Sequence, residues 1–268
     1  MRFEKWQGTG NHHIVVERDA WPLSVTPERA RLLCDPSFGI GADGLLEISW
    51  EAGTPRMTVW NGDGSIAENC GNGIRIIARY LSRDGRLPEH GHVLTGGGTT
   101  TVRVRGDAQV EVDMGTAVFT TGESHETLKI HGVNVAFADI SMGNPHAVID
   151  HPDPAAVVRT VGPQIETDPR FPKGTNVEFV RADGPSTLEM RVWERGVGET
   201  LACGTGACAA AVAGVRLSDM RSPVTVRLLG GDLLIDVDDN LEVTMTGPAE
   251  PVFAGELSPA MIATLEAL

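Results

Sequence analysis

Two cysteines stand at matching places in this chain of 268 residues, and they are the first candidates for chemistry. Cys70 begins the sequence CGNG and Cys203 begins CGTG, 133 residues later. Each begins a glycine-flanked turn at the expected start of a helix, where free backbone N–H groups and the helix dipole stabilise a thiolate or a bound carboxylate. The pattern predicts reactive thiols; the alternative is that two small residues were kept for packing.

The offset of 133 residues relates other segments as well. TGNHHIVVE at 9–17 lies over MGNPHAVID at 142–150 with four identities, where chance gives about one. Further pairs at this offset are Phe38 and Phe171, Met57 and Met190, Val59 and Val192, Trp60 and Trp193, and Gly97 and Gly230. Twice the offset spans nearly the whole chain, so we interpret the pattern as an internal duplication into two domains.

Two opposed thiols suit a reaction that needs one base on each face of a carbon atom, which is stereoinversion. One thiolate would remove a proton while the other thiol donates one, and the pair would titrate as a unit. Such a reaction needs no cofactor. The three lysines, Lys5, Lys129 and Lys173, have no context that suggests an aldimine, so pyridoxal phosphate chemistry is not expected.

The elements that must position these thiols recur in both halves. The predicted strands are Ile14–Glu17, Thr101–Arg105 and Val110–Met114 in the first half, and Ala147–Asp150, Leu188–Trp193 and Leu233–Val237 in the second. An apolar helix follows each cysteine, and the second one, over 207–215, has the small side chains of a helix enclosed by a sheet. We therefore expect an α+β fold of two pseudo-symmetric duplicated domains with a ligand cleft between them.

The predicted domains comprise 1–116 with 249–268, and 117–248, and the polar stretch at 120–126 suits a linker. With 36 acidic and 22 basic side chains the formal charge is −14, which excludes nucleic acid and anionic membranes as expected partners. No apolar run approaches the roughly 20 residues that span a bilayer. The start, MRFEKWQG, lacks the features of a secretory signal, so we expect a cytoplasmic protein with its cysteines as thiols.

Several other motifs receive structural interpretations. Gly39, Gly41 and Gly44 spell GxGxxG, but the motif follows a helix-like segment and precedes a strand-like one, the reverse of a dinucleotide site. We expect a turn there. Cys34 and Cys208 do not obey the repeat and are predicted core residues. The sequence His90-Gly91-His92 is expected in a polar loop without ligand spacing, so no metal site is predicted.

Four blocks, NGDGSIAENCGNG, SMGNPHAVI, GTNVEFV and ERGVGETLACGTGACAAA, together resemble the diaminopimelate epimerase family over nearly the whole chain. The resemblance implies two domains, each with a mostly antiparallel sheet wrapped around a central helix, and an active site in the cleft between them. It also implies interconversion of LL- and meso-2,6-diaminopimelate, in lysine and cell-wall precursor biosynthesis, without cofactor or metal. Homodimers are common in that family.

The resemblance also assigns roles to particular residues. Cys70 and Cys203 match the two bases, and His146 and Glu194 match positions beside the thiols. The residues implied to bind substrate are Gly71, Asn72, Gly204 and Thr205 at the reacting carboxylate, Asn61, Asn144, Asn176, Glu194 and Arg195 at the distal end, and Asn11 along the site. Where this chain has His12-His13 many family members have Asp-Phe, and at Gly44 many have a glutamine.

Three other functions remain open on the sequence. A related two-cysteine racemase would act on another amino acid, although ERGVGET argues against the proline type. A thiol redox protein would join Cys70 and Cys203 in a reversible disulfide, would need a reductant and would not exchange an α-proton. A non-catalytic binding protein would have little use for both thiols, Arg195 and the asparagines.

Overall fold

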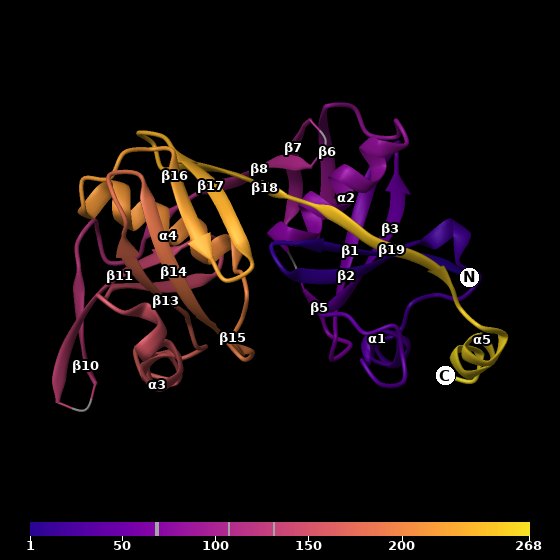
Figure 1. Cartoon of the computed structure of the whole chain (residues 1–268), viewed down its shortest axis with the longest axis horizontal. Helices are drawn as coiled ribbons and strands as arrows, with labels where there is room; N and C mark the ends of the chain where they lie inside the picture. The colour runs from indigo at the N-terminus through magenta and orange to yellow at the C-terminus, as the bar shows by residue number, and fades with distance from the viewer. Residues whose placement is uncertain (68–69, 107, 131) are drawn as a thin grey trace. The chain divides into compact units, whose positions relative to one another are not determined.

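The computed structural model describes residues 1–67, 70–106, 108–130 and 132–268 (Figure 1). It divides into two compact units, which we call unit 1 (Met1–Val112 and Gly247–Leu268) and unit 2 (Asp113–Thr246). The division thus falls after Val112 and Thr246, where the sequence placed domain boundaries after 116 and 248. Each unit is described here by itself.

Unit 1 is one curved sheet with helices in two of its connections. Its strands are β1 (Arg2–Gly8), β2 (Asn11–Glu17), β3 (Gly44–Glu51), β4 (Thr54–Asn61), β5 (Ile66–Ala67), β6 (His90–Thr95), β7 (Gly98–Arg105), β8 (Gln109–Thr116) and β19 (Glu250–Glu256). Hydrogen bonding orders them β19-β1-β2-β3-β4-β6-β7-β8, with β5 paired to β4. Among the pairings of the described residues in this unit, only β2/β3 and β4/β6 are parallel. Helices α1 (Pro27–Cys34) and α2 (Gly71–Arg83) lie in these two connections, as parallel pairing requires a crossover.

Unit 2 repeats this order. Its strands are β9 (Val118–Phe119), β10 (Glu126–Ile130), β11 (Val133–Ser141), β12 (Pro145–Asp150), β13 (Asn176–Ala182), β14 (Thr187–Glu194), β15 (Gly198–Glu199), β16 (Val224–Leu228), β17 (Gly231–Val237) and β18 (Glu242–Pro248). Strands β11-β12-β13-β14-β16-β17-β18 are neighbours in turn. Of these neighbouring pairs, as far as the structure describes them, only β12/β13 and β14/β16 are parallel. Helices α3 (Pro154–Glu166) and α4 (Gly204–Leu217) fill the same two connections. The predicted duplication is confirmed by this shared topology.

Strand register refines which residues are equivalent. In unit 1 His13 pairs with Gly44, and Leu46 pairs with Val15. In unit 2 His146 pairs with Asn176, and Glu178 pairs with Val148. His13 and His146 are therefore equivalent at the offset of 133, but β13 is displaced by one residue because the connection before it is one residue shorter. Leu46 and Glu178 consequently occupy equivalent places, which the ungapped repeat does not show.

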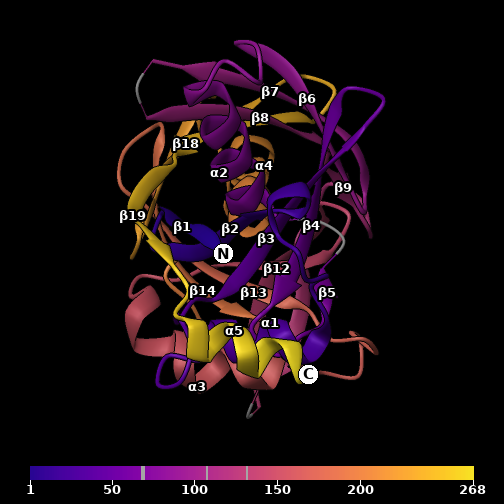
Figure 2. The same ribbon diagram turned by 90° about the vertical axis from the view of Figure 1, so that its right-hand side faces the viewer.

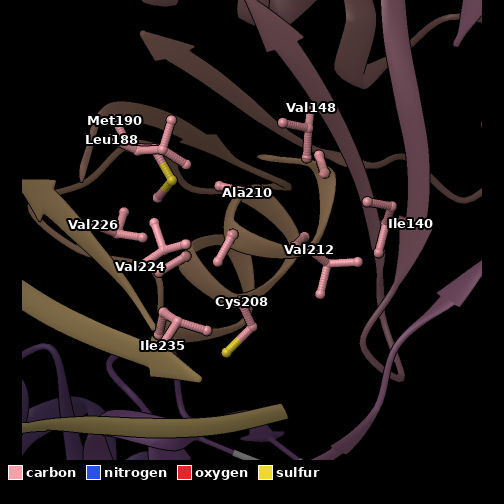
Figure 3. Packing of buried hydrophobic residues seen from close by; sticks show 14 of the residues in the cluster. Ile140, Val148, Leu188, Met190, Cys208, Ala210, Val212, Val224, Val226 and Ile235 are labelled. Atoms are coloured by element: carbon pink, nitrogen blue, oxygen red, sulfur yellow. The ribbon is translucent and has the colours of Figure 1, made fainter. Parts of the chain in front are cut away.

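The central helix of each unit lies against the inner face of its own sheet. Helix α2 contacts β1, β2, β3, β4, β6 and β7 (Figure 2). Helix α4 contacts β11 to β14, β16 and β17, and Ala210 and Val212 are fully buried beneath side chains such as Met190 and Ile235 (Figure 3). The small alanine side chains of α4 allow strands to pack closely on several sides of the helix. The prediction that a sheet encloses this helix is therefore confirmed.

One further helix, α5 (Pro259–Glu266), follows β19, and a 3-10 turn (Arg18–Ala20) follows β2. The predicted glycine turn is confirmed, because Gly39 follows α1, Gly44 begins β3, and Gly41 and its repeat partner Gly174 have φ of 78° and 72°. The predicted loop at 90–92 is wrong, since His90 begins β6. Buried Gly91 between two exposed histidines follows strand alternation, which a residue without a side chain conceals. Within the described residues no helix has the length and apolar character of a membrane span.

Candidate active site

Cys70 is the residue immediately before α2, in extended backbone at φ −152°. Its Sγ accepts a hydrogen bond from the backbone N–H of Gly73 at 3.3 Å, so that the thiol caps the first turn of the helix. The side chain is half-buried. A thiolate here would meet the N–H groups and the positive end of the helix dipole, as the sequence predicted.

Asn72 and Asn11 connect the start of α2 to β2. The Asn72 amide donates to Asn11 Oδ1 at 3.3 Å and accepts from Arg75 at 2.8 Å. Asn11 in turn donates to the carboxylate of Asp43 at 3.0 Å. Arg75 is fully buried and also donates to the Pro248 carbonyl and the Thr9 hydroxyl. These hydrogen bonds hold the two asparagines in fixed orientations at the start of α2.

Cys203 occupies the same position before α4, but in a more enclosed setting. It is 6% exposed, and its Sγ lies 3.6 Å from Thr205 Oγ1. Burial raises the pKa of the Cys203 thiol well above its usual range, and the charges of Glu194 and Glu178 raise it further. The resting thiol of unit 2 is accordingly protonated.

Asn144 links Cys203's neighbour Thr205 to a buried histidine. The Asn144 amide donates to Thr205 Oγ1 at 3.3 Å, and its Oδ1 lies 3.0 Å from His146 Nε2. The other ring nitrogen, Nδ1, lies 2.7 Å from Glu178 Oε1. Asn144 to Thr205 repeats the contact of Asn11 with Asn72, since both pairs are separated by 61 residues. Both units therefore tie an asparagine on a sheet to the first turn of the central helix.

Glu194 and Arg195 lie at the end of β14, where the chain turns toward β15. Thr200 donates to Glu194 Oε1 at 2.5 Å, and burial raises the pKa of the Glu194 carboxyl despite this bond and one with Cys203. Asn176 accepts from the Arg195 backbone N–H at 3.0 Å and donates to the Pro145 carbonyl at 3.0 Å. The Arg195 guanidinium donates to the Lys173 carbonyl at 3.3 Å, which leaves part of its donor fork for other groups.

The predicted residues fall into two groups, one in each unit. Unit 1 carries Asn11, Asn61, Cys70, Gly71 and Asn72, and unit 2 carries Asn144, His146, Asn176, Glu194, Arg195, Cys203, Gly204 and Thr205. Hydrogen bonds join Asn11 with Asn72, and Asn144 with His146 and Thr205. Asn61 is separate from that network: its amide donates to the Ser65 hydroxyl at 2.9 Å in the turn after β4.

Sequence reasoning missed Glu178, a fully buried carboxyl group whose Oε1 atom lies beside Nδ1 of His146. The signal that could have found it is a glutamate inside the apolar strand NVEFV, since an acidic residue is rarely buried without a partner. Within the described residues no cluster of three histidine, cysteine or acidic side chains could hold a metal ion. The groups present are suited to proton transfer at a thiol and to binding carboxylate and amino groups.

The fold is shared with solved structures of low sequence identity. A probable proline racemase from Agrobacterium radiobacter superposes with a TM-score of 0.70 at 12% identity, over 96% of this chain and 93% of that one. At that identity the likeness concerns the fold alone.

The sequence defines the family more narrowly. The chain belongs to the diaminopimelate epimerase family, whose model matches residues 3–120 and 138–252. The diaminopimelate epimerase of Cyanothece sp. is 43% identical, over 96% of this chain and 99% of the relative. That of Alkalilimnicola ehrlichii is 41% identical, over 96% and 98%. The resemblance found in the sequence blocks is thereby confirmed.

Proposed function

We propose that this protein catalyses the epimerisation of LL-2,6-diaminopimelate to meso-diaminopimelate by a two-base mechanism that needs no cofactor. The observation that carries the proposal is the matched placement of Cys70 and Cys203 directly before the central helices of the two units. Family membership and the names of the relatives support the substrate. Under this proposal the enzyme supplies a precursor of lysine and of the cell wall.

In the proposed mechanism one cysteine, as thiolate, removes the α-proton and the other, as thiol, donates a proton to the opposite face of the same carbon. The two roles exchange in the reverse direction. The protonated state of buried Cys203 supports its role as donor in one direction. The mechanism requires that both thiols reach one carbon atom in the working enzyme.

The negative charge that develops on the substrate would spread into its α-carboxylate. We assign that carboxylate to the helix starts. There the backbone N–H groups of Gly71, Asn72, Gly204 and Thr205 have no carbonyl of the preceding helical turn to donate to, so they can donate to a bound carboxylate. Because these dipoles are fixed before the reaction, they stabilise the transition state without reorganisation. His146 and Glu194 would adjust the proton affinity of the thiols or contact the substrate ammonium group.

The distal amino acid end is assigned to a second set of polar groups. Its proposed ligands are Asn61, Asn144, Asn176, Glu194 and Arg195, with Asn11 lining the site. The planar fork of Arg195 suits a carboxylate. A homodimer in the cytoplasm is part of the proposal by analogy with the family.

The test is incubation of the reduced protein with LL-diaminopimelate in deuterium oxide, followed by chiral chromatography and mass spectrometry. We expect conversion to the meso form with deuterium at the inverted carbon, since the donated proton comes from a thiol that exchanges with solvent. Absence of both conversion and exchange, in folded protein with free thiols, would contradict the proposal. Exchange with another amino acid of a panel would instead indicate a racemase of different specificity.

A further inference from the structure

Glu178 is a buried carboxyl group whose presence the folding of unit 2 does not explain. Neither its side chain nor that of His146 is exposed to solvent. Glu178 Oε1 lies 2.7 Å from His146 Nδ1, whereas Oε2 has no hydrogen-bond partner among the described residues. A buried polar oxygen without a partner costs stability. A carboxyl group that lowers stability at this place indicates a role for Glu178 other than folding.

Unit 1 shows what the fold itself needs at this place. Leu46 has the register position of Glu178, and both lie against the third residue of the central helix's first turn. A Cβ added at Gly73 would lie 2.9 Å from Leu46 Cδ2, and one added at Gly206 would lie 2.5 Å from Glu178 Oε1. The sheet of unit 1 therefore accepts an apolar side chain at the place equivalent to Glu178, beneath the start of its own central helix. The carboxyl group is present at this place only in unit 2.

The unit 1 histidine confirms the contrast. His13 is the equivalent of His146, and the position equivalent to Glu178 is occupied in unit 1 by Leu46. The Nδ1 atom of His13 is buried and has no hydrogen-bond partner among the described residues. Burial lowers the pKa of His13 to about 4. The pair of histidine and glutamate is thus present only in the unit that carries Cys203.

From Glu178 a continuous series of contacts leads to the thiol. Its members, each within hydrogen-bonding distance of the next, are Glu178, His146, Asn144, Thr205 and Cys203. The series begins in β13 and ends at Cys203, the residue before α4. If Glu178 moved, the His146 ring would lose the contact that orients it. The Asn144 side-chain amide, which contacts this ring and donates to the Thr205 hydroxyl, would then be less firmly held.

We propose that Glu178 is a positioning residue for Cys203, which acts through His146 and Asn144 on Thr205 and by its charge on the thiol itself. The inference rests on the proposed function, because it concerns one of the two bases of that reaction. The titratable groups around the thiol are Glu194 at the end of β14, Glu178 in β13 and His146 in β12. Burial is the largest cause of the raised pKa of Cys203, and the two glutamates add to it.

The test uses three substitutions and a matched control. Glu178→Leu introduces the residue of unit 1, Glu178→Gln removes the charge and keeps the shape, and Glu178→Asp keeps the charge and withdraws the contact. Glu189→Gln, on the neighbouring strand β14, removes a half-exposed glutamate that pairs with Arg181 and is the control. The readout is the pH midpoint of Cys203 alkylation by iodoacetamide, measured on the Cys203 peptide by mass spectrometry.

We expect the midpoint to move to lower pH by roughly one unit in Glu178→Leu and Glu178→Gln, since a nearby negative charge has been removed. Glu178→Asp and Glu189→Gln should retain the wild-type midpoint. In Glu178→Asp we expect kcat for diaminopimelate to fall at least tenfold with little change in KM, because only the positioning is lost.

An unchanged midpoint in folded Glu178→Gln would overturn the inference, as would an equal shift in Glu189→Gln. If Glu178→Leu does not fold, Glu178→Gln and Glu178→Asp still decide between charge and contact. A wild-type protein that does not epimerise diaminopimelate would refute the proposed function, while the alkylation measurement would still test the effect of Glu178 on Cys203.

Discussion

At the scale of single residues, the position just before a helix gives the two thiols their chemical setting. Cys70 caps α2 through the Gly73 N–H, while Cys203 is buried beside Thr205 and carboxyl groups. The same residue type at the same position therefore has two different environments. That asymmetry suits a reaction in which one thiol removes a proton while the other donates one.

The first prediction concerns these thiols. Cys70→Ser and Cys203→Ser should each lower kcat by about 10²-fold or more, because a hydroxyl is a much weaker base than a thiolate at neutral pH. The thermal midpoint should change little. Cys34→Ala, in the core of unit 1, is the control that should retain turnover. Wild-type activity in either serine variant would exclude the two-base mechanism.

The second prediction concerns His13, whose pKa burial lowers to about 4 from an ordinary 6.5. Between these values the unfolded chain binds more protons than the folded one, so stability falls as pH falls through 6.5 toward 4. The full loss is about 3 kcal/mol. His13→Phe should remove that part of the pH dependence in denaturant titrations from pH 7 to 4.

His92→Gln, on the exposed face of β6, provides the matched control and should leave the pH dependence unchanged. An identical slope in wild type and His13→Phe would show that His13 is not buried as a neutral ring.

Residue-level sequence reasoning identified the thiols because duplication repeats them at one spacing. The repeat did not reveal Glu178, because the equivalent residue in unit 1 is Leu46 and a one-residue displacement hides the match. Burial and hydrogen-bond partners depend on strand register, which the sequence pattern of β13 does not specify.

At the scale of elements, α4 is the part of unit 2 that the sheet encloses. Its buried residues are mostly alanine and glycine, so the helix approaches the strands closely and leaves no space for larger side chains. The small-residue run predicted this helix correctly. By contrast, residues 90–92 at the start of β6 were predicted as a loop, because the buried position of the strand alternation is Gly91, which has no apolar side chain.

The third prediction concerns that packing. Ala210→Leu should lower the free energy of unfolding by about 1–3 kcal/mol, because the added atoms meet a fully buried position. Ala263→Leu, on the exposed side of α5, should have little effect. Urea denaturation followed by circular dichroism measures both. Equal stability of the two variants would contradict the enclosed position of α4.

At the scale of the whole molecule, the proposed mechanism requires that both units engage one substrate. Each unit contributes one thiol and one helix start, so neither contains a complete set of proposed ligands. The duplication indicated this division from sequence alone. The exact unit boundary could not be predicted from the sequence, because it falls inside two strands: β8 and β18 each continue from one unit into the other.

The fourth prediction follows from this division. Saturating diaminopimelate should slow amide hydrogen exchange at both helix starts, 71–73 and 204–206. Bound substrate would make local opening of the backbone at these residues less favourable, and exchange requires that opening. Mass spectrometry of peptic peptides gives the measurement, and the α5 peptide serves as the unaffected reference. Protection in one unit alone would contradict a substrate shared by two thiols.

Unit 2 is continuous in the chain, whereas unit 1 takes its last strand, β19, from residues beyond it. During synthesis on the ribosome, unit 2 is complete once Thr246 has emerged. Strand β1, which precedes unit 2 in the chain, has both edges paired only after β19 has also been made. The half that is translated first is therefore the half that finishes folding last, and its exposed β1 edge is the segment most in need of protection in the nascent chain.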